Sequence, residues 1–214
     1  MLDPNDYIIT RKRKKYKFAL FANSPLCFEY DEWEKAPADI LEIGAGTGLF
    51  AVALAETWPN RKVVAVDVKA DRLVKGAHRA AERGIENIQF LRSRADQLLD
   101  LFPEHAVEAI WITFPDPFPR ERSQNRRLTN QKFLTIYQQL LKEDGVLYFK
   151  TDARSLFEWS LEQLVAAGWS IQELSFDLHE SNLAEYYKTE TTYEARFRAE
   201  GIAINFVKAI PPGE

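Results

Sequence analysis

The chain has 214 residues, 46% of them hydrophobic and 28% charged, as in a globular protein of one large or two small domains. Its longest stretch without a charge, residues 43–55, contains three glycines and is too short for a membrane helix, which needs roughly 18 apolar residues. The single cysteine, Cys27, excludes an internal disulfide and a metal site built from cysteines. A basic stretch at 11–17 precedes a segment broken by polar residues and proline, unlike a signal peptide, so we expect a cytoplasmic protein.

The net charge of −4 does not by itself suggest a nucleic-acid partner. Basic residues are nevertheless clustered, because six of the seven positions at 11–17 are Lys or Arg and four arginines fall within 120–127. Such clusters create local fields that a total charge hides. Either run, taken alone, is as well explained by a solvated surface.

Residues 1–37 lack a clear period, and we expect a basic arm with a short helix there. From residue 38 to 214 the pattern predicts one domain in which strands alternate with helices. The expected strands are 39–43, 62–67, 87–91, 107–113, 145–150, 169–176 and 203–207. The expected helices are 49–58, 71–84, 96–102, 129–141 and 154–167. This order predicts an α/β, Rossmann-like fold with a mostly parallel seven-stranded sheet, helices on both faces and a closing antiparallel strand. In such sheets the ligand binds at the carboxyl ends of the strands.

The first predicted strand runs into a glycine loop with Gly44, Gly46 and Gly48, which lets the backbone approach a ligand closely. The spacing is G-x-G-x-G, with Leu49 where a dinucleotide fingerprint has its last glycine, and no P-loop lysine follows. A pyrophosphate ligand is therefore disfavoured.

Acidic residues stand at the ends of the first three strands. Glu42 directly precedes the glycine loop, where it would repel a phosphate but suit a cation, and Asp67 ends the second strand, where an acid usually binds ribose hydroxyls. Asp96 follows the third strand, at a place suited to an adenine amino group or to an N-cap of the 96–102 helix, and the two roles are compatible. S-adenosylmethionine carries a sulfonium and an amino group and no phosphate, so the set predicts a Rossmann-like methyltransferase using this cofactor.

The fourth strand ends in a stiff loop that holds Asp116 between Pro115 and Pro117. A carboxylate fixed at this strand end would face the transferable methyl group. The arginine cluster that follows suits a nucleobase bound in a pocket with its phosphates held alongside.

At these motifs the chain closely resembles the bacterial tRNA (guanine-N7-)-methyltransferases of the TrmB type. The resemblance covers roughly residues 38–208 and rests on the loop 114–128, on F-K-T-D at 149–152, on D-L-H-x-S-N-L at 177–183 and on T-T-Y-E at 191–194. It implies transfer of a methyl group from S-adenosylmethionine to N7 of a guanine in the tRNA variable loop. It also implies tRNA as partner, no membrane, no obligatory protein partner, no metal, and a monomer or homodimer.

The family's site residues carry over by position. The resemblance implies cofactor binding by Glu42, Gly44, Gly46, Gly48, Asp67, Asp96 and Asp116, with Asp116 also catalytic. It implies substrate binding by Arg120, Asp152, Thr191, Thr192, Tyr193 and Glu194, and RNA binding by Arg122, Ser123, Gln124, Asn125, Arg126 and Arg127. The chain departs from the family's commoner residues at Asp67, Phe118 and Ser123, where many members have Glu, Trp and His.

Guanine N7 has a lone pair and no proton, so its attack on the methyl group needs no strong base, and positioning with electrostatics should suffice. Asp152 and Glu194 are our candidate acceptors for the N1–H and N2–H of guanine. The alternatives are a helix cap for Asp152 and a helix-surface acid for Glu194. Tyr186, Tyr187 and Tyr193 could stack on a base, although packing is the simpler reading, and His179 is read as structural.

Two other functions fit parts of the sequence. A methyltransferase acting on a small molecule or a protein would keep the acidic set and leave both basic runs as ordinary surface. A non-catalytic RNA-binding scaffold would not need the four acids Glu42, Asp67, Asp96 and Asp116, so their presence argues against it.

Overall fold

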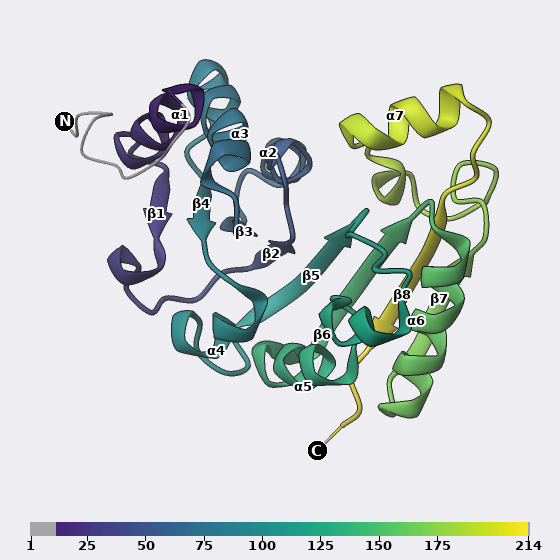
Figure 1. Cartoon of the computed structure of the whole chain (residues 1–214). Coiled ribbons are helices and arrows are strands. Elements are labelled where there is room, and N and C mark those ends of the chain that lie inside the picture. The colour runs from purple at the N-terminus through teal and green to yellow at the C-terminus, as the bar shows by residue number, and fades with distance from the viewer. Residues whose placement is uncertain (1–11, 214) are drawn as a thin grey trace.

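The computed structural model describes residues 12–213, which form one sheet flanked by helices (Figure 1). The eight strands lie in the order β1-β4-β3-β2-β5-β6-β8-β7. They are β1 Cys27–Glu29, β2 Ile40–Ile43, β3 Val63–Asp67, β4 Ile88–Arg92, β5 Val107–Thr113, β6 Leu141–Thr151, β7 Ser170–Ser175 and β8 Asn205–Ile210. The helices are α1 Lys12–Ala22, α2 Leu49–Thr57, α3 Ala70–Arg83, α4 Leu98–Leu101, α5 Gln131–Leu140, α6 Arg154–Ala166 and α7 Thr192–Ala199.

The Rossmann-like α/β class is confirmed, because the strands from β1 to β6 pair in parallel, while β8 pairs antiparallel with both β6 and β7. Two details differ from expectation. The sheet has one strand more than the predicted seven, because β1 pairs with β4 at the edge. The antiparallel strand β8 does not close the edge but lies between β6 and β7.

The two faces of the sheet are covered by different sets of helices. Along β5, Ile110 and Ile112 belong to the core that includes residues of α4, α5 and α6, whereas Trp111 belongs to the core that includes residues of α1, α2 and α3. This alternation follows from the period of two in a strand. It explains why β5 is apolar on both faces, as expected of a strand buried in a parallel sheet.

The order of strands in the sheet places the ends that carry the predicted site residues next to one another. β2, β3 and β5 are neighbours in the sheet, and β6 follows β5. Their carboxyl ends, and the loops after them, meet at one edge of the sheet. No helix among residues 12–213 is long and apolar enough to cross a membrane.

Candidate active site

A cavity of about 1150 Å³ opens at the carboxyl ends of the parallel strands. It is lined by the loops that follow successive strands, with contributions from the start of α7. The predicted site residues that line it are Glu42, Gly44, Gly46, Asp67, Asp96, Asp116, Arg126, Asp152, Thr191 and Tyr193. Segments far apart in sequence are thus assembled around one cavity at the carboxyl ends of the strands, as predicted from the sequence.

The glycine loop turns through left-handed backbone conformations at Gly44, Gly46 and Gly48, with φ of 74°, 56° and 67°. Gly46 is open on its cavity side, since a Cβ built there meets nothing within 4 Å. Gly48 does not line the cavity. It is the N-cap of α2, and a Cβ there would lie 2.6 Å from Cε1 of Phe90. The close approach to Phe90 shows that Gly48 packs α2 against the sheet, and its expected role in binding a cofactor stays a prediction.

Asp67 ends β3 and orders the glycine loop that follows β2. Its Oδ2 accepts a hydrogen bond from the Gly46 amide at 2.8 Å and its Oδ1 one from the Lys69 amide at 2.8 Å. Burial raises the pKa of Asp67, and the two amide bonds work against that rise. A carboxylate has about four acceptor positions, so Asp67 keeps lone pairs for hydroxyls in the cavity.

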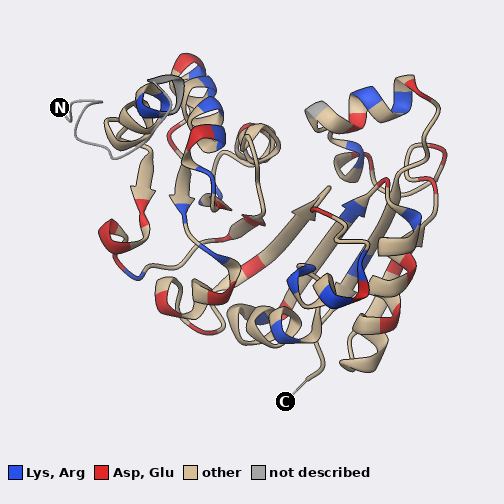
Figure 2. Cartoon of the chain, viewed as in Figure 1, with Lys and Arg blue, Asp and Glu red and all other residues tan. Residues whose placement is uncertain are grey.

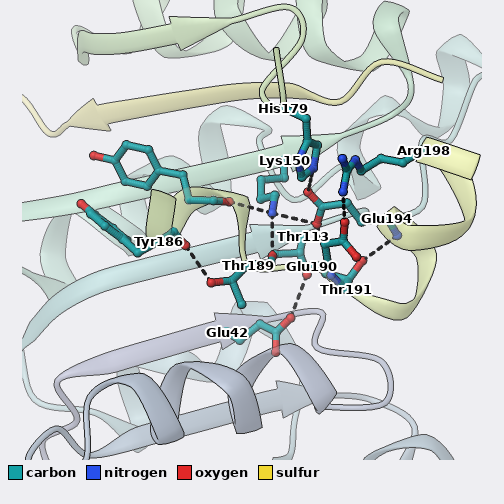
Figure 3. Close-up of polar contacts among 11 residues, drawn as sticks. Glu42, Thr113, Lys150, His179, Tyr186, Thr189, Glu190, Thr191, Glu194 and Arg198 are labelled. Carbon is teal, nitrogen blue, oxygen red and sulfur yellow. Dashed lines mark hydrogen bonds and ion pairs between the residues drawn. The ribbon is translucent and has the colours of Figure 1, made fainter. Parts of the chain in front are cut away.

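Glu42 lies at the base of the cavity and is only 1% exposed. Its Oε2 accepts from the Ala51 amide at 3.0 Å and its Oε1 from the Thr113 hydroxyl at 2.8 Å, so it ties together β2, α2 and β5. Figure 3 shows the bond to Thr113. Burial raises the pKa of Glu42 to about 8. A cation in the cavity would stabilise its charged form.

Asp96 lines the cavity from the 3₁₀ helix Ala95–Gln97 after β4, which with α4 replaces the single helix expected at 96–102. Both of its oxygens bind Arg94, at 2.8 and 2.6 Å, and this hydrogen bonding lowers the pKa of Asp96. The N-cap of α4 is Gln97. The capping alternative for Asp96 was therefore wrong, and its partly exposed side chain faces the cavity.

The loop after β5 presents Asp116 to the cavity as an exposed side chain. Phe114 and Phe118 on either side have φ of 49° and 40°, a left-handed conformation that side chains rarely adopt. Arg127 holds this strained turn: its Nε donates to the Pro117 carbonyl at 3.0 Å and its Nη2 to the Phe118 carbonyl at 3.2 Å.

Arg127 is thereby corrected from a predicted RNA contact to an internal brace, since it is 7% exposed and its guanidinium lies 4.4 Å from the Trp159 ring centre. Its neighbour Arg126 does line the cavity and lies over the Phe118 ring. Arg120 and Arg122 are exposed and lie outside the cavity lining. Ser123, Gln124 and Asn125 belong to the 3₁₀ helix Glu121–Arg126 (η4).

Asp152 follows β6 and lines the cavity. The N-cap of α6 is Ala153, without a side-chain cap, and the Ala153 amide donates to the Thr151 hydroxyl at 3.1 Å. The capping alternative for Asp152 was therefore wrong. Within residues 12–213, neither Asp116 nor Asp152 has a hydrogen-bond or ion-pair partner, and both face the same space.

The T-T-Y-E segment divides into exposed and buried parts. Thr191 and Tyr193 line the cavity, and Tyr193 is 49% exposed. The side chain of Thr192 lies outside the described part of the structure. Glu194 is fully buried and lies outside the cavity lining, so the helix-surface alternative was wrong.

Among the tyrosines near this segment, Tyr187 is 1% exposed and its ring centre lies 4.6 Å from that of Phe206. Packing is therefore its role. Tyr186 remains at the surface and lies outside the cavity lining. His179 contacts buried Glu194 at 2.8 Å, which confirms its structural reading.

The edge strand β1 adds cavity residues that sequence reasoning missed. Glu29 ends β1 opposite Arg92 at the end of β4, and the two side chains form an ion pair of 3.0 Å. Both line the cavity, as does the next residue, Tyr30. Three residues are too few to show the alternation of a strand. The available signal was Glu29, an acid that follows two apolar residues and could form an ion pair with the basic residue Arg92 at another strand end.

The chain is similar to known methyltransferases. Residues 36–207 match a family model described as "Putative methyltransferase". A tRNA (guanine-N(7)-)-methyltransferase of Cytophaga hutchinsonii is 40% identical over 172 residues, which cover 79% of this chain and 78% of that protein. One of Brevibacillus brevis is 36% identical over 198 residues, covering 90% and 91%.

Solved structures show the same fold at low identity. The 16S rRNA methyltransferase KamB superposes with a TM-score of 0.62 at 18% identity, covering 85% of this chain and 90% of that one. The antibiotic-resistance methyltransferase Kmr gives a TM-score of 0.58 at 16% identity, with coverage of 96% and 95%. With the family model spanning most of the chain and relatives this similar over most of their length, the chain belongs to the bacterial TrmB family of tRNA (guanine-N7-)-methyltransferases.

Proposed function

We propose that this protein transfers the methyl group of S-adenosylmethionine to N7 of a guanine in tRNA. The observation that carries the proposal is the pair of carboxylates Asp116 and Asp152, which face the cavity from adjacent strand ends with no protein partner in the described chain. Groups left unpaired in this way are available to a ligand. The names of the relatives above supply the substrate class.

The cofactor half of the cavity fits S-adenosylmethionine by its chemistry. Asp67 keeps acceptor positions for ribose hydroxyls, and Gly46 leaves its backbone open. Glu42, Asp67 and Asp116 give the cavity carboxylates on several sides, which suits a cationic ligand and disfavours a phosphate. When bound, this cofactor supplies the methyl group on a positively charged sulfur.

The residues of the chain then need to orient and stabilise rather than to remove a proton. Asp116, on its stiff loop, is placed to position the guanine and to favour the positive charge that the ring gains on methylation. Asp152 can accept N–H bonds from the Watson–Crick edge of guanine. Both roles depend on fixed positions, which strand ends and a braced loop provide.

A tRNA can approach despite the negative net charge because basic residues lie around the cavity. Figure 2 shows Lys and Arg concentrated on α3 and around the turn before α5. Lys69 and Arg72 line the cavity from one side, Arg126 and Lys132 from the other. The basic stretch at 11–17 begins outside the described residues, and Lys17 of α1 donates to the Asp71 carbonyl at 3.4 Å, next to Arg72 on α3. We propose Arg120, Arg122 and Arg126 as phosphate contacts.

Finer assignments complete the proposal. The guanine lies in the tRNA variable loop, the protein works in the cytoplasm, and it requires no protein partner. The basic stretch at 11–17 contacts RNA, and β1 joins residues 38–214 in the catalytic domain, because it pairs with β4 and ends at the cavity.

The test is nucleoside mapping. Unmodified tRNA is incubated with the protein and S-adenosylmethionine, digested, and analysed by mass spectrometry for 7-methylguanosine. We expect one methylated fragment, from the variable loop. A tRNA with 7-deazaguanine at that position, which lacks N7, is the matched control and should not be methylated. Methylation of the control at the same fragment, or no methylation of tRNA at all, contradicts the proposal.

A further inference from the structure

A fully buried cation lies directly behind the cavity. Lys150, next to the end of β6, is 0% exposed. Its Nζ donates to the carbonyls of Tyr187 at 2.9 Å and Thr189 at 3.0 Å, and to Oε2 of Glu194 at 2.8 Å (Figure 3). An ammonium group has three N–H donors, so Lys150 has none left for a ligand.

Glu194 is closed off in the same way. It is 0% exposed, its Oε1 lies 2.8 Å from Nε2 of His179, and its Oε2 also accepts from the Thr191 amide at 3.2 Å. The Thr191 hydroxyl in turn accepts from the Glu194 amide at 3.0 Å, which completes a capping box at the start of α7. Three of its roughly four acceptor positions meet protein groups, and none of the side chain is exposed.

The network therefore joins two parts of the cavity wall. Lys150 lies on β6, two residues before Asp152, which follows that strand. The segment whose carbonyls it binds, 187–189, directly precedes Thr191 and Tyr193, which line the cavity. α7 is only eight residues long, and a helix of that length takes its position from tertiary contacts. The buried ion pair, with its two loop carbonyls, is the polar part of those contacts.

We propose that Lys150 is a positioning residue, which acts through Glu194 and His179 to set the wall formed by Thr191 and Tyr193 against Asp152. In this arrangement Glu194 accepts hydrogen bonds from the protein and not from guanine. The inference rests on the proposed function, because it assigns that wall to the guanine side of the cavity. It also explains why an acid in a substrate-binding motif is fully buried.

The loss of stability on breaking the network depends on which residue is changed. Removing the ammonium leaves a buried carboxylate and two buried carbonyls without their partner, which is strongly destabilising. Replacing Glu194 by Gln keeps the shape and can keep the capping box, because Gln serves at the third helical position as Glu does. Changing both residues removes both charges together.

The test compares Lys150→Met, Glu194→Gln and the double variant Lys150→Met/Glu194→Gln. Lys142→Met is the matched control, since Lys142 also lies on β6 and also pairs with an acid, Glu108 at 2.9 Å, away from the cavity. The readouts are kcat and KM for tRNA, the Kd of S-adenosylmethionine, and amide hydrogen exchange across residues 187–194.

We expect Lys150→Met to lower kcat/KM for tRNA by about tenfold to a hundredfold, as a displaced wall would. The cofactor Kd should stay close to wild type, and exchange should accelerate in 187–194 but not in β2 or β3. Glu194→Gln should lose less than Lys150→Met, and the double variant should recover part of that loss. Lys142→Met should behave as wild type.

Two results overturn the proposal. One is wild-type kcat/KM in Lys150→Met. The other is a loss in Glu194→Gln as large as in Asp152→Asn, which would identify Glu194 as a direct guanine acceptor. If Lys150→Met does not fold, the comparison of Glu194→Gln with Asp152→Asn still decides. If the wild-type protein makes no 7-methylguanosine, the proposed function fails, whereas the exchange data still report on the network.

Discussion

The two halves of the cavity are ordered by side chains of opposite charge. The glycine loop, Glu42 and Asp67 line one half, and Asp116, Asp152 and the start of α7 line the other. In the half proposed to bind the cofactor, called the cofactor half, carboxylates order the backbone: Asp67 binds the amides of Gly46 and Lys69, and Glu42 binds the amide of Ala51. In the half proposed to bind the guanine, called the substrate half, buried cations order the backbone. Arg127 binds two carbonyls of the Asp116 loop, and Lys150 binds two carbonyls ahead of α7.

The difference shows how each half keeps its working groups available. The glycine loop exposes backbone amides, so an acid is the group that can order it. The substrate half needs free carboxylates, and cations bound to carbonyls order its loops without occupying Asp116 or Asp152. One consequence is that the unpaired side chains of Asp116 and Asp152 can be changed with little loss of stability, provided that the two buried cations remain.

Asp116→Ala should give the largest effect of the predicted variants, because it tests a free carboxylate of the substrate half. Because the side chain is exposed and has no partner within the described chain, the free energy of unfolding should stay close to wild type. Turnover should fall by about 10²–10³-fold, the range for losing one preorganised electrostatic group in an active site. Single-turnover methylation and denaturant unfolding measure the two effects. A folded variant with wild-type turnover would remove Asp116 from the mechanism.

Asp67→Ala tests the cofactor half. Loss of hydrogen bonds to an ionised acceptor should weaken S-adenosylmethionine binding by about 1.5–3 kcal/mol. The glycine loop should also loosen, since Gly46 and Lys69 lose their acceptor. Calorimetric titration measures the affinity, and tRNA affinity without cofactor is the control that should not change. Unchanged cofactor affinity would show that Asp67 does not contact the ligand.

Arg127→Met and Arg126→Met separate a brace from a contact on one loop. Arg127→Met should lower the free energy of unfolding by about 1–3 kcal/mol, because two carbonyls lose their donor, and it should lower turnover as well. Arg126→Met should leave stability unchanged and reduce the log–log salt slope of tRNA binding by about 0.7–0.9. Unfolding curves and binding at several salt concentrations distinguish the variants. Equal stability of the two would refute the brace.

Glu42 gives a graded effect, a dependence of stability on pH. Its pKa is about 8 in the folded protein against 4.5 ordinarily, so the folded state holds a proton that the unfolded state releases between these values. The free energy of unfolding contributed by this group therefore falls as pH rises through that window, by at most about 1.4 kcal/mol per pH unit. Glu42→Gln should flatten this dependence. Denaturant unfolding across the window measures it, and parallel curves for the two proteins would contradict it.

The sequence predicted what depends on strong local patterns. Apolar strands with buried neighbours, such as 107–113, were found to the residue, because a strand buried on both faces leaves a continuous apolar run. The insertion of β8 between β6 and β7 and the pairing of β1 with β4 depend on contacts distant in sequence, which no local pattern shows.

The site divides in the same way. Acids at strand ends were placed correctly because parallel strands bring their carboxyl ends together. Arg127 and Glu194 were assigned to ligands from their positions in the family's motifs, although both are buried, which is unusual for charged residues. Their burial depends on partners in other segments, Trp159 for one and Lys150 for the other. A motif gives the residues that a site requires, but not which of them face the ligand.

The place of β8 determines the order in which the molecule can be completed. β6 hydrogen-bonds on one side to β5 and on the other to β8, whose residues 205–210 leave the ribosome after every other described strand. The neighbours β2, β3, β4 and β5 can pair from sequence already synthesised, so the glycine loop can form early in translation. The wall held by Lys150 is completed only with β8, because Tyr187, whose carbonyl binds Lys150, packs on Phe206 of β8. A nascent chain can thus acquire its cofactor site before the site for tRNA is complete.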